Sequence, residues 1–329
     1  MGIQPTRRTL LGAFAAAPLA GAAASGRPIR LGGPIFLKNA EAGTELHGTT
    51  GHVAVRPPRE SDDPRELARD HRRLGYSAAY CPPSKPDDTA HTRAIAEAFA
   101  AENVVLAEVG AWCNMMDPDA EKRRANLRYV TERLALAEAV GSRCCVDYSG
   151  SFNPKVPWGP NPGNLSKEFF DGTVENCRQV LDAIKPKRTT FTIEMMGWSV
   201  PDNPDNYLKL IRAVDRKQFA VHLDVCNGIN CPTKFYNSAA YIEECFHKLG
   251  RWIVSCHAKD LAWIVELNVH FQEVIPGRGS VDYHAYLREI SKLPVDAPLM
   301  LEHLKTPEEY EEGKTYILKI GGETGVRFV

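Results

Sequence analysis

The 329-residue sequence predicts a single (β/α)8 TIM barrel, an α/β fold in which eight parallel strands alternate with helices. Three observations support this prediction. Short apolar runs alternate eight times with helical patterns. Roughly 300 residues are available, and such a barrel typically needs about 250. Acidic or imidazole side chains also end four successive apolar runs, which is where these barrels keep their catalytic groups.

Eight apolar runs of strand length are predicted to form the barrel. Each is short and is separated from the next by a helical pattern, as buried parallel strands are. Their ranges are 29–36, 76–81, 104–112, 143–148, 190–195, 219–225, 252–258 and 299–303.

Eight segments between these runs are predicted to be helices. Several begin with capping chemistry, such as Asp63 before Pro64, Ser166 before an early acid, and Thr306 before Pro307. The predicted helices are 62–74, 88–102, 119–140, 166–184, 204–214, 238–249, 282–293 and 307–319.

An open doubly wound sheet is the rival fold for an alternating α/β chain. That fold would place a glycine-rich phosphate-binding turn, G-x-G-x-x-G, after its first strand. The chain has Leu31-Gly32-Gly33-Pro34 there. The sequence therefore favours the closed barrel.

Residues 1–25 are predicted to be a twin-arginine export signal. Arg7 and Arg8 precede an alanine-rich apolar stretch, which ends in the small-residue cleavage pattern of residues 22–25. Because that stretch is too short to span a bilayer, we expect no stable membrane anchor. The barrel is then expected over residues 26–329 of a periplasmic or secreted protein that uses the twin-arginine export machinery.

Composition indicates a folded domain with a small-molecule partner. The chain is 43% hydrophobic and 25% charged, and its 40 basic and 41 acidic residues give a net charge of -1. Such a balance provides no general attraction for nucleic acid or anionic membrane. The nine cysteines form no recognisable disulfide framework, although Cys226 and Cys231 flank one loop and their pairing stays open.

The four strand-end side chains are Glu194, Asp224, His257 and Glu302. Because parallel strands of a barrel end at one rim, these groups are predicted to converge on one divalent cation. Three carboxylates and one imidazole suit Mn²⁺ best, with Mg²⁺ or Co²⁺ also suitable and Zn²⁺ second in preference.

Side chains two positions before each ligand share its face of the strand and should form the layer beneath the cation. Three of them are polar: Thr192, His222 and Ser255; the fourth is Met300. Polar groups in this layer are what ligand-supporting hydrogen bonds require, and His222 is the candidate for that role.

Other polar residues are predicted at or near the rim as substrate-binding groups. Glu108 and Lys259 are the strongest candidates because they end strands. The connections 149–165 and 261–281 are long enough to act as lids or substrate walls. The remaining rim candidates are His47, His52, Asp147 and Arg278.

These residues stand in recognisable motifs. They are I-E at Glu194, H-L-D at Asp224, H-A-K-D at His257, P-G-R-G-x-V-D-Y over residues 276–283, and L-E-H at Glu302. The chain thereby resembles the xylose isomerase-like barrels, which include ketose 3-epimerases, hydroxypyruvate isomerase, inosose dehydratase and the distant endonuclease IV. The resemblance spans residues 29–320.

The resemblance implies a sugar isomerase or epimerase. Glu194 and Glu302 would bind the cation and also transfer protons, and the cation would stabilise the enediolate that forms when a proton leaves next to a carbonyl. The epimerases usually have a histidine three residues after the metal-binding aspartate, where this chain has Asn227. An amide can bind a substrate hydroxyl but cannot carry a proton, so substrate and reaction type stay open.

Three alternatives follow from the same residues. A β-eliminating lyase or dehydratase of 3-keto-sugars or inososes could use the same proton abstraction, and a non-catalytic sugar-binding barrel could keep the fold alone. A nuclease is disfavoured because the early strands offer few histidines. Export makes a free or oxidised sugar a better substrate than a sugar phosphate. Assembly into a homo-oligomer is left open.

Overall fold

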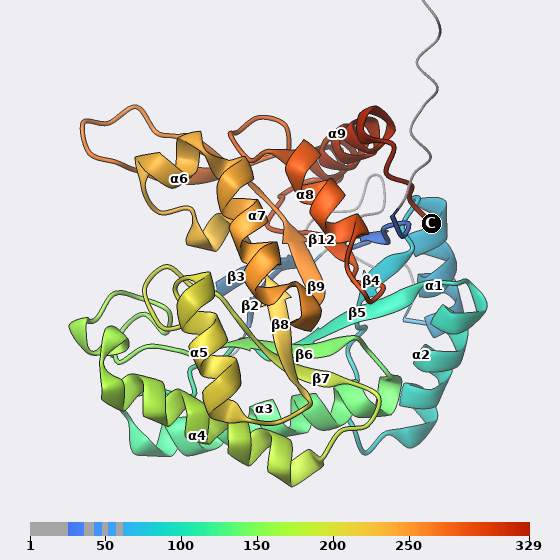
Figure 1. Ribbon diagram of the computed structural model, residues 1–329. Helices are drawn as coiled ribbons and strands as arrows, with labels where there is room; N and C mark the ends of the chain where they lie inside the picture. Colours follow the sequence, from blue (N-terminus) through green and yellow to red (C-terminus); the bar gives the residue numbers. More distant parts are fainter. Residues whose placement is uncertain (1–25, 36–42, 48–51, 57–61) are drawn as a thin grey trace, which may run out of the picture.

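The computed structural model describes residues 26–35, 43–47, 52–56 and 62–329. Eight parallel strands close a barrel in the order β1-β12-β9-β8-β7-β6-β5-β4, and helices surround it (Figure 1). The predicted barrel is confirmed, whereas the export signal lies outside the described residues. The strands are β1 (Leu31–Gly32), β4 (Ala78–Tyr80), β5 (Val105–Gly110), β6 (Cys144–Tyr148), β7 (Thr190–Glu194), β8 (Phe219–Leu223), β9 (Ile253–Ala258) and β12 (Leu299–Leu301).

The predicted helices are all present, and their capping side chains act as expected. Asp63 accepts a hydrogen bond from Arg65 N, and Ser166 accepts one from Phe169 N, so each satisfies a free N–H of the first turn. The helices are α1 (Pro64–Arg73), α2 (Thr89–Ala101), α3 (Ala120–Val140), α4 (Lys167–Ile184), α5 (Pro204–Val214), α7 (Ser238–Leu249), α8 (Tyr283–Ser291) and α9 (Pro307–Thr324).

Strand alternation divides the buried side chains into two layers. On β7, Phe191 and Ile193 belong to the apolar core between strands and helices, whereas Thr192 and Glu194 face the barrel interior. The strand–helix layer therefore carries the large apolar contacts. Near the rim, polar side chains occupy the barrel interior.

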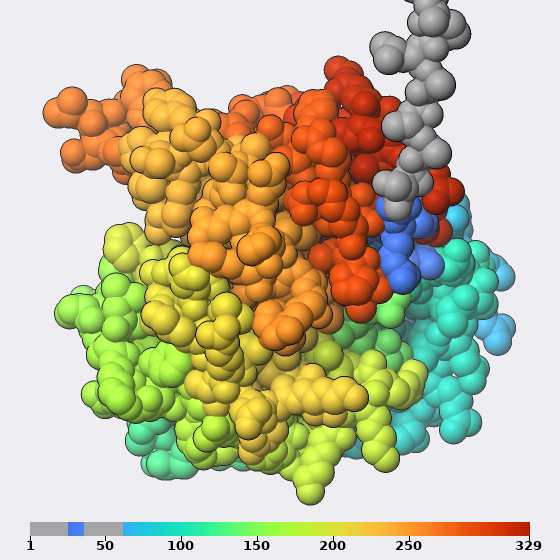
Figure 2. Space-filling view, viewed as in Figure 1, coloured from blue at the N-terminus to red at the C-terminus, as the bar shows by residue number. Residues whose placement is uncertain are grey.

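Two hairpins and one short helix were not predicted. They are β2 (Gly43–His47) with β3 (His52–Arg56), β10 (Asp260–Trp263) with β11 (Phe271–Val274), and α6 (Pro232–Tyr236). The connection 261–281, expected as a loop, thus contains the β10–β11 hairpin. Phe271 stacks on Phe235 of α6 with ring centroids 4.5 Å apart. The hairpin projects from the barrel as an orange lobe in Figure 2.

The connection 149–165 is anchored by hydrogen bonds of buried asparagine side chains. Asn164 is fully buried, accepts a hydrogen bond from Phe152 N at 2.9 Å and donates to the carbonyl oxygens of Gly159 and Trp198 at 3.0 Å each. Asn114 Oδ1 likewise accepts from Ser151 N at 2.9 Å. These buried amides replace the regular backbone pairing that a loop lacks.

Two further expectations concern membranes and thiols. Across the described residues no helix combines the length and apolarity needed to cross a bilayer. Cys226 and Cys231 are both free thiols.

Candidate metal centre

The four strand-end residues converge at one rim of the barrel. Glu194 ends β7, Asp224 follows β8, His257 lies near the end of β9, and Glu302 follows β12. Each offers one ligand atom, and these four atoms lie within 4.8 Å of one another. Convergence follows from the parallel strands, because their carboxyl ends share one rim.

His257 stands at the centre of this group. Its Nδ1 lies 2.9 Å from Glu194 Oε1, 2.9 Å from Glu302 Oε2 and 3.7 Å from Asp224 Oδ2. The Asp224 side chain is fully buried, whereas that of Glu302 is 15% exposed. Glu302 is therefore the member of the group that solvent, or a substrate, reaches most easily.

Lys259 completes the group with a buried cation. Its ammonium lies 2.8 Å from Asp224 Oδ2 and 2.8 Å from Glu302 Oε2, and 3.5 Å from Glu273 Oε1. Burial alone would lower the pKa of Lys259, but Asp224 and Glu302 raise it well above its ordinary value. Lys259 is thus held charged between two of the four candidate ligands.

Charged neighbours lower the pKa of the two carboxylates nearest to Lys259, those of Asp224 and Glu302. Burial alone would raise the pKa of Glu302, but the neighbouring His257, His303 and Lys259 lower it well below its ordinary value. The pKa of Asp224 is also lowered, because Lys259 and His257 outweigh the effect of burial.

The donor set fits a hard divalent cation. Asp224 Oδ2 and Glu302 Oε2 are buried oxygens, and each lies 2.8 Å from the ammonium of Lys259. Buried carboxylates need a positive partner, which can be an ammonium group or a metal ion. Three carboxylates and one imidazole within coordinating reach match the ligands that Mn²⁺ and Mg²⁺ prefer.

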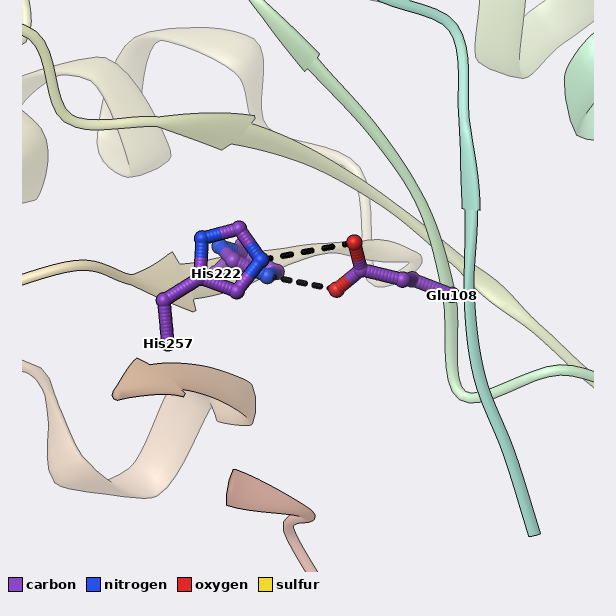
Figure 3. Close-up of side chains that lie close together, drawn as sticks. All are labelled: Glu108, His222 and His257. Carbon is purple, nitrogen blue, oxygen red and sulfur yellow. Dashed lines mark hydrogen bonds and ion pairs between the residues drawn. The ribbon is translucent and has the colours of Figure 1, made fainter. Parts of the chain in front are cut away.

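A second polar cluster lies deeper in the barrel. Glu108 of β5, predicted at the rim, is instead 1% exposed and two residues short of the end of its strand. Its carboxylate contacts His222 Nε2 at 2.8 Å and His257 Nε2 at 3.4 Å (Figure 3). Burial would raise the pKa of Glu108, but His257 and His222 lower it to about 2.

Of two other residues predicted to bind substrate, Asn227 lies beside the cluster and Arg278 lies away from it. Asn227 is next to the cluster, where its backbone N–H donates to Asp224 Oδ1 at 3.4 Å. Arg278 is exposed and forms a bidentate ion pair with Glu312 of α9, at 2.6 Å and 2.7 Å, so it contacts none of the four ligands. The pairing occupies the face of the guanidinium that a substrate carboxylate or phosphate would use.

Asp147, another rim candidate, lies outside the cluster. Asp147 pairs in register with Ile193 of the strand–helix layer and accepts a hydrogen bond from Cys113 N at 2.9 Å. His47 and His52 are paired in register in the β2–β3 hairpin, and their side chains lie outside the described part of the chain.

The glycine-rich motif 276–281 is explained by Asp260. The carboxylate of Asp260 accepts hydrogen bonds from the backbone N–H groups of Gly277, Gly279 and Val281 at 2.9–3.0 Å. A Cβ on Gly279 would lie 2.3 Å from Asp260 Oδ1, so only glycine lets the backbone approach this closely. The H-A-K-D and P-G-R-G motifs are thus one structural unit.

Sequence reasoning missed two residues beside the cluster, Trp112 and His303. Trp112 has a φ of 45°, and its ring centroid lies 6.4 Å from those of Tyr148 and His257. His303, with a φ of 60°, bridges Glu273 at 2.8 Å and Glu302 at 3.5 Å. Positive φ at bulky residues is uncommon and clusters at functional sites. The alternation of apolar and polar residues along the sequence does not predict a positive φ at either position.

A TIM barrel with a buried carboxylate–imidazole cluster at the carboxyl ends of its strands defines the class of the protein. The chain matches the xylose isomerase-like TIM barrel family over residues 67–320 and belongs to that family. The resemblance inferred from the motifs is therefore confirmed. No curated protein matches the sequence.

Similar solved structures cover most of both chains. A xylose isomerase-like TIM barrel protein from Mycobacterium smegmatis in complex with magnesium is 16% identical, with a TM-score of 0.59, over 92% of this chain and 99% of that chain. The 3-keto-D-glucoside 4-epimerase YcjR from E. coli is 15% identical, with a TM-score of 0.55, over 79% and 95%.

The probable 3-DHS dehydratase AsbF from Bacillus anthracis is 12% identical, with a TM-score of 0.58, over 79% of this chain and 93% of that chain. At these identities the similarity shows the fold alone. The fold is thus shared by proteins described as epimerases and as a dehydratase.

Proposed function

We propose that the protein is an exported, cation-dependent sugar isomerase or epimerase that removes a proton next to a carbonyl. The observation that carries the proposal is the pairing of two carboxylates, Glu194 and Glu302, each 2.9 Å from His257 Nδ1 in one buried cluster. Both glutamates could serve as ligands of one cation, and two carboxylates beside the same ring nitrogen also provide two groups for proton transfer.

The cation would be held by Glu194, Asp224, His257 and Glu302, with Mn²⁺ preferred. When bound, it would polarise the substrate carbonyl and stabilise the negative charge that develops as the proton leaves. Coordination by His257 requires an unprotonated Nδ1.

Glu302 is the group best suited to accept the substrate proton. Its carboxylate is ionised, and it is the most exposed of the four candidate ligands. Glu194 would then deliver or receive a proton at its Oε1, on the opposite face of the substrate carbon. Proton exchange by one carboxylate gives isomerisation, and exchange by both gives epimerisation.

Lys259 and Asn227 would bind substrate oxygens. The Lys259 ammonium already lies 2.8 Å from Glu302 Oε2, close enough to donate to a substrate oxygen that approaches this carboxylate. Asn227 can orient a hydroxyl but cannot shuttle a proton. Trp112, beside the cluster, would shield the reacting carbon from water.

The substrate class we propose is an unphosphorylated sugar, free or oxidised at carbon 3. Five carboxylates stand in or beside the cluster, namely those of Glu108, Glu194, Asp224, Glu273 and Glu302. Their negative charge disfavours binding of the phosphate group of a sugar phosphate. The twin-arginine signal proposed for residues 1–25 would also place the protein where phosphorylated metabolites are scarce.

A β-eliminating lyase is the second candidate. It would use the same proton abstraction and then expel a group β to the carbonyl. The observation that favours it is Asn227 at the position where the epimerases usually have histidine. The similarity to a protein described as a probable dehydratase also supports it.

Solvent-deuterium exchange separates these functions. Protein loaded with Mn²⁺ would be incubated in D₂O with a panel of ketoses and 3-keto-glycosides. We expect deuterium at the carbon next to the carbonyl, with an unsaturated product absorbing ultraviolet light only if elimination follows. Absence of exchange with every compound would favour a non-catalytic sugar-binding barrel.

A further inference from the structure

The deeper cluster places one carboxylate behind the imidazole of the candidate metal centre. Glu108, His222 and His257 come from three strands, β5, β8 and β9, and are 1%, 0% and 0% exposed. Figure 3 shows both imidazoles turned toward the Glu108 carboxylate. The two rings meet edge to face, with centroids 4.1 Å apart.

His257 is contacted at both ring nitrogens by different groups. Its Nδ1 faces Glu194 and Glu302 at 2.9 Å each, whereas its Nε2 faces Glu108 Oε1 at 3.4 Å. A metal-ligating nitrogen must present a lone pair, so the ring proton must then sit on the other nitrogen. A carboxylate accepts hydrogen bonds, so Glu194 and Glu302 favour a proton on Nδ1 while no cation is bound, and Glu108 favours one on Nε2. Once a cation takes the lone pair of Nδ1, Glu108 is the carboxylate placed to accept the remaining ring proton from Nε2.

His222 holds Glu108 in place. The contact between His222 Nε2 and Glu108 Oε2 is 2.8 Å, shorter than the contact to His257. The Nδ1 of His222 neither accepts nor donates a hydrogen bond within the described part of the chain. His222 therefore makes its one side-chain hydrogen bond to Glu108, and that bond fixes the carboxylate between the two rings.

We propose that Glu108 is a positioning residue that holds His257 with its proton on Nε2 and thereby presents Nδ1 to the cation. The inference rests on the proposed cation site and adds a role that the ligands themselves do not fill. Carboxylates placed behind ligating histidines typically change metal affinity about 10–100-fold when removed.

A competing arrangement would have Glu108, His222 and His257 bind a second cation of their own, because their ligand atoms also lie within 4.8 Å of one another. That arrangement would require His257 to lose both ring protons and bridge two ions. A hydrogen bond from the Nε2–H of His257 to Glu108 requires the loss of only one ring proton.

The test measures Mn²⁺ affinity and stoichiometry by calorimetry in the wild type, in Glu108→Gln, and in Asp147→Asn as a control. Asp147 is also a buried strand carboxylate, on β6, but it contacts none of the four ligands. We expect one Mn²⁺ per chain. Its dissociation constant should rise about 10–100-fold in Glu108→Gln, because the amide can donate to Nε2, and stay unchanged in Asp147→Asn.

A second readout needs no variant. Nitrogen-15 resonances of histidine-labelled wild type with Mg²⁺ should show His257 protonated at Nε2. Unchanged Mn²⁺ affinity in folded Glu108→Gln, a His257 proton on Nδ1, or two Mn²⁺ ions per wild-type chain would each overturn the role of Glu108. If the wild type bound no cation, that result would instead contradict the proposed function, and the positioning role would fall with it.

Discussion

Glu302 is proposed both to bind the cation and to accept the substrate proton, whereas Asp224 is proposed only to bind the cation. The surroundings of the two residues differ accordingly. Glu302 is partly exposed and faces Lys259, His303 and His257, whereas Asp224 is fully buried. A partly exposed carboxylate can meet a substrate proton, whereas a fully buried one serves as a ligand or ion-pair partner. The two residues should therefore respond differently to substitution.

Glu302→Gln should abolish turnover while keeping the fold. The amide oxygen can replace one ligand atom, but the side chain cannot accept the substrate proton. We expect a loss of at least about 100-fold in kcat, since general-base catalysis contributes roughly 100- to 10,000-fold. Circular dichroism would check the fold, and retained turnover would refute the acid–base role.

Asp224→Ala should lose the cation. Its carboxylate is the most buried of the three carboxylates in the group of four candidate ligands. Elemental analysis after dialysis against Mn²⁺ should find far less manganese than in the wild type. An equal manganese content would show that Asp224 is not a ligand.

Among the elements, the strands and helices were predictable because their signals are local. Period, caps and length identified all eight barrel strands and the helices between them. The β10–β11 hairpin was missed because a distant contact stabilises it, the stacking of Phe271 on Phe235. Glu108 was misplaced because β5 continues to Gly110, which keeps its side chain inside the barrel.

The candidate site was predictable only in part. Convergence of four strand ends follows from barrel geometry, so Glu194, Asp224, His257 and Glu302 could be expected to meet. The pairing of Arg278 with Glu312 could not, because it depends on how α9 packs beside the glycine-rich loop. Whether these residues perform the proposed roles stays a prediction.

Strand β6 carries a buried carboxyl that should make stability depend on pH. Burial raises the pKa of Asp147 well above its ordinary value. Because the folded-state pKa is the higher one, the unfolded chain ionises first as pH rises above about 4. Asp147 should thus cost the folded state up to about 1.4 kcal/mol per pH unit until pH reaches the raised pKa.

Asp147→Asn should remove this dependence. Urea unfolding of the cation-free wild type and the variant at several pH values between 4 and 7 would measure it. The free energy of unfolding of the wild type should fall relative to that of the variant as pH rises. Parallel curves would show that Asp147 is not held protonated.

At the scale of the whole molecule, the barrel and its cation should stabilise each other. A cation that binds only the folded chain adds about 2.7 kcal/mol at a free concentration 100 times its Kd. Thermal unfolding should therefore shift upward with Mn²⁺ and return on addition of a chelator. Asp224→Ala provides the control, and an equal shift in that variant would place the cation elsewhere.

The whole account depends on one ion held by residues from β7, β8, β9 and β12. Anomalous diffraction from crystals soaked with Mn²⁺ tests this most directly, because it locates manganese independently of any assumed ligand. We predict a single strong peak within about 2.0–2.4 Å of oxygens of Glu194, Asp224 and Glu302 and of His257 Nδ1. A map with no peak there, or with manganese bound only at other residues, would contradict the account.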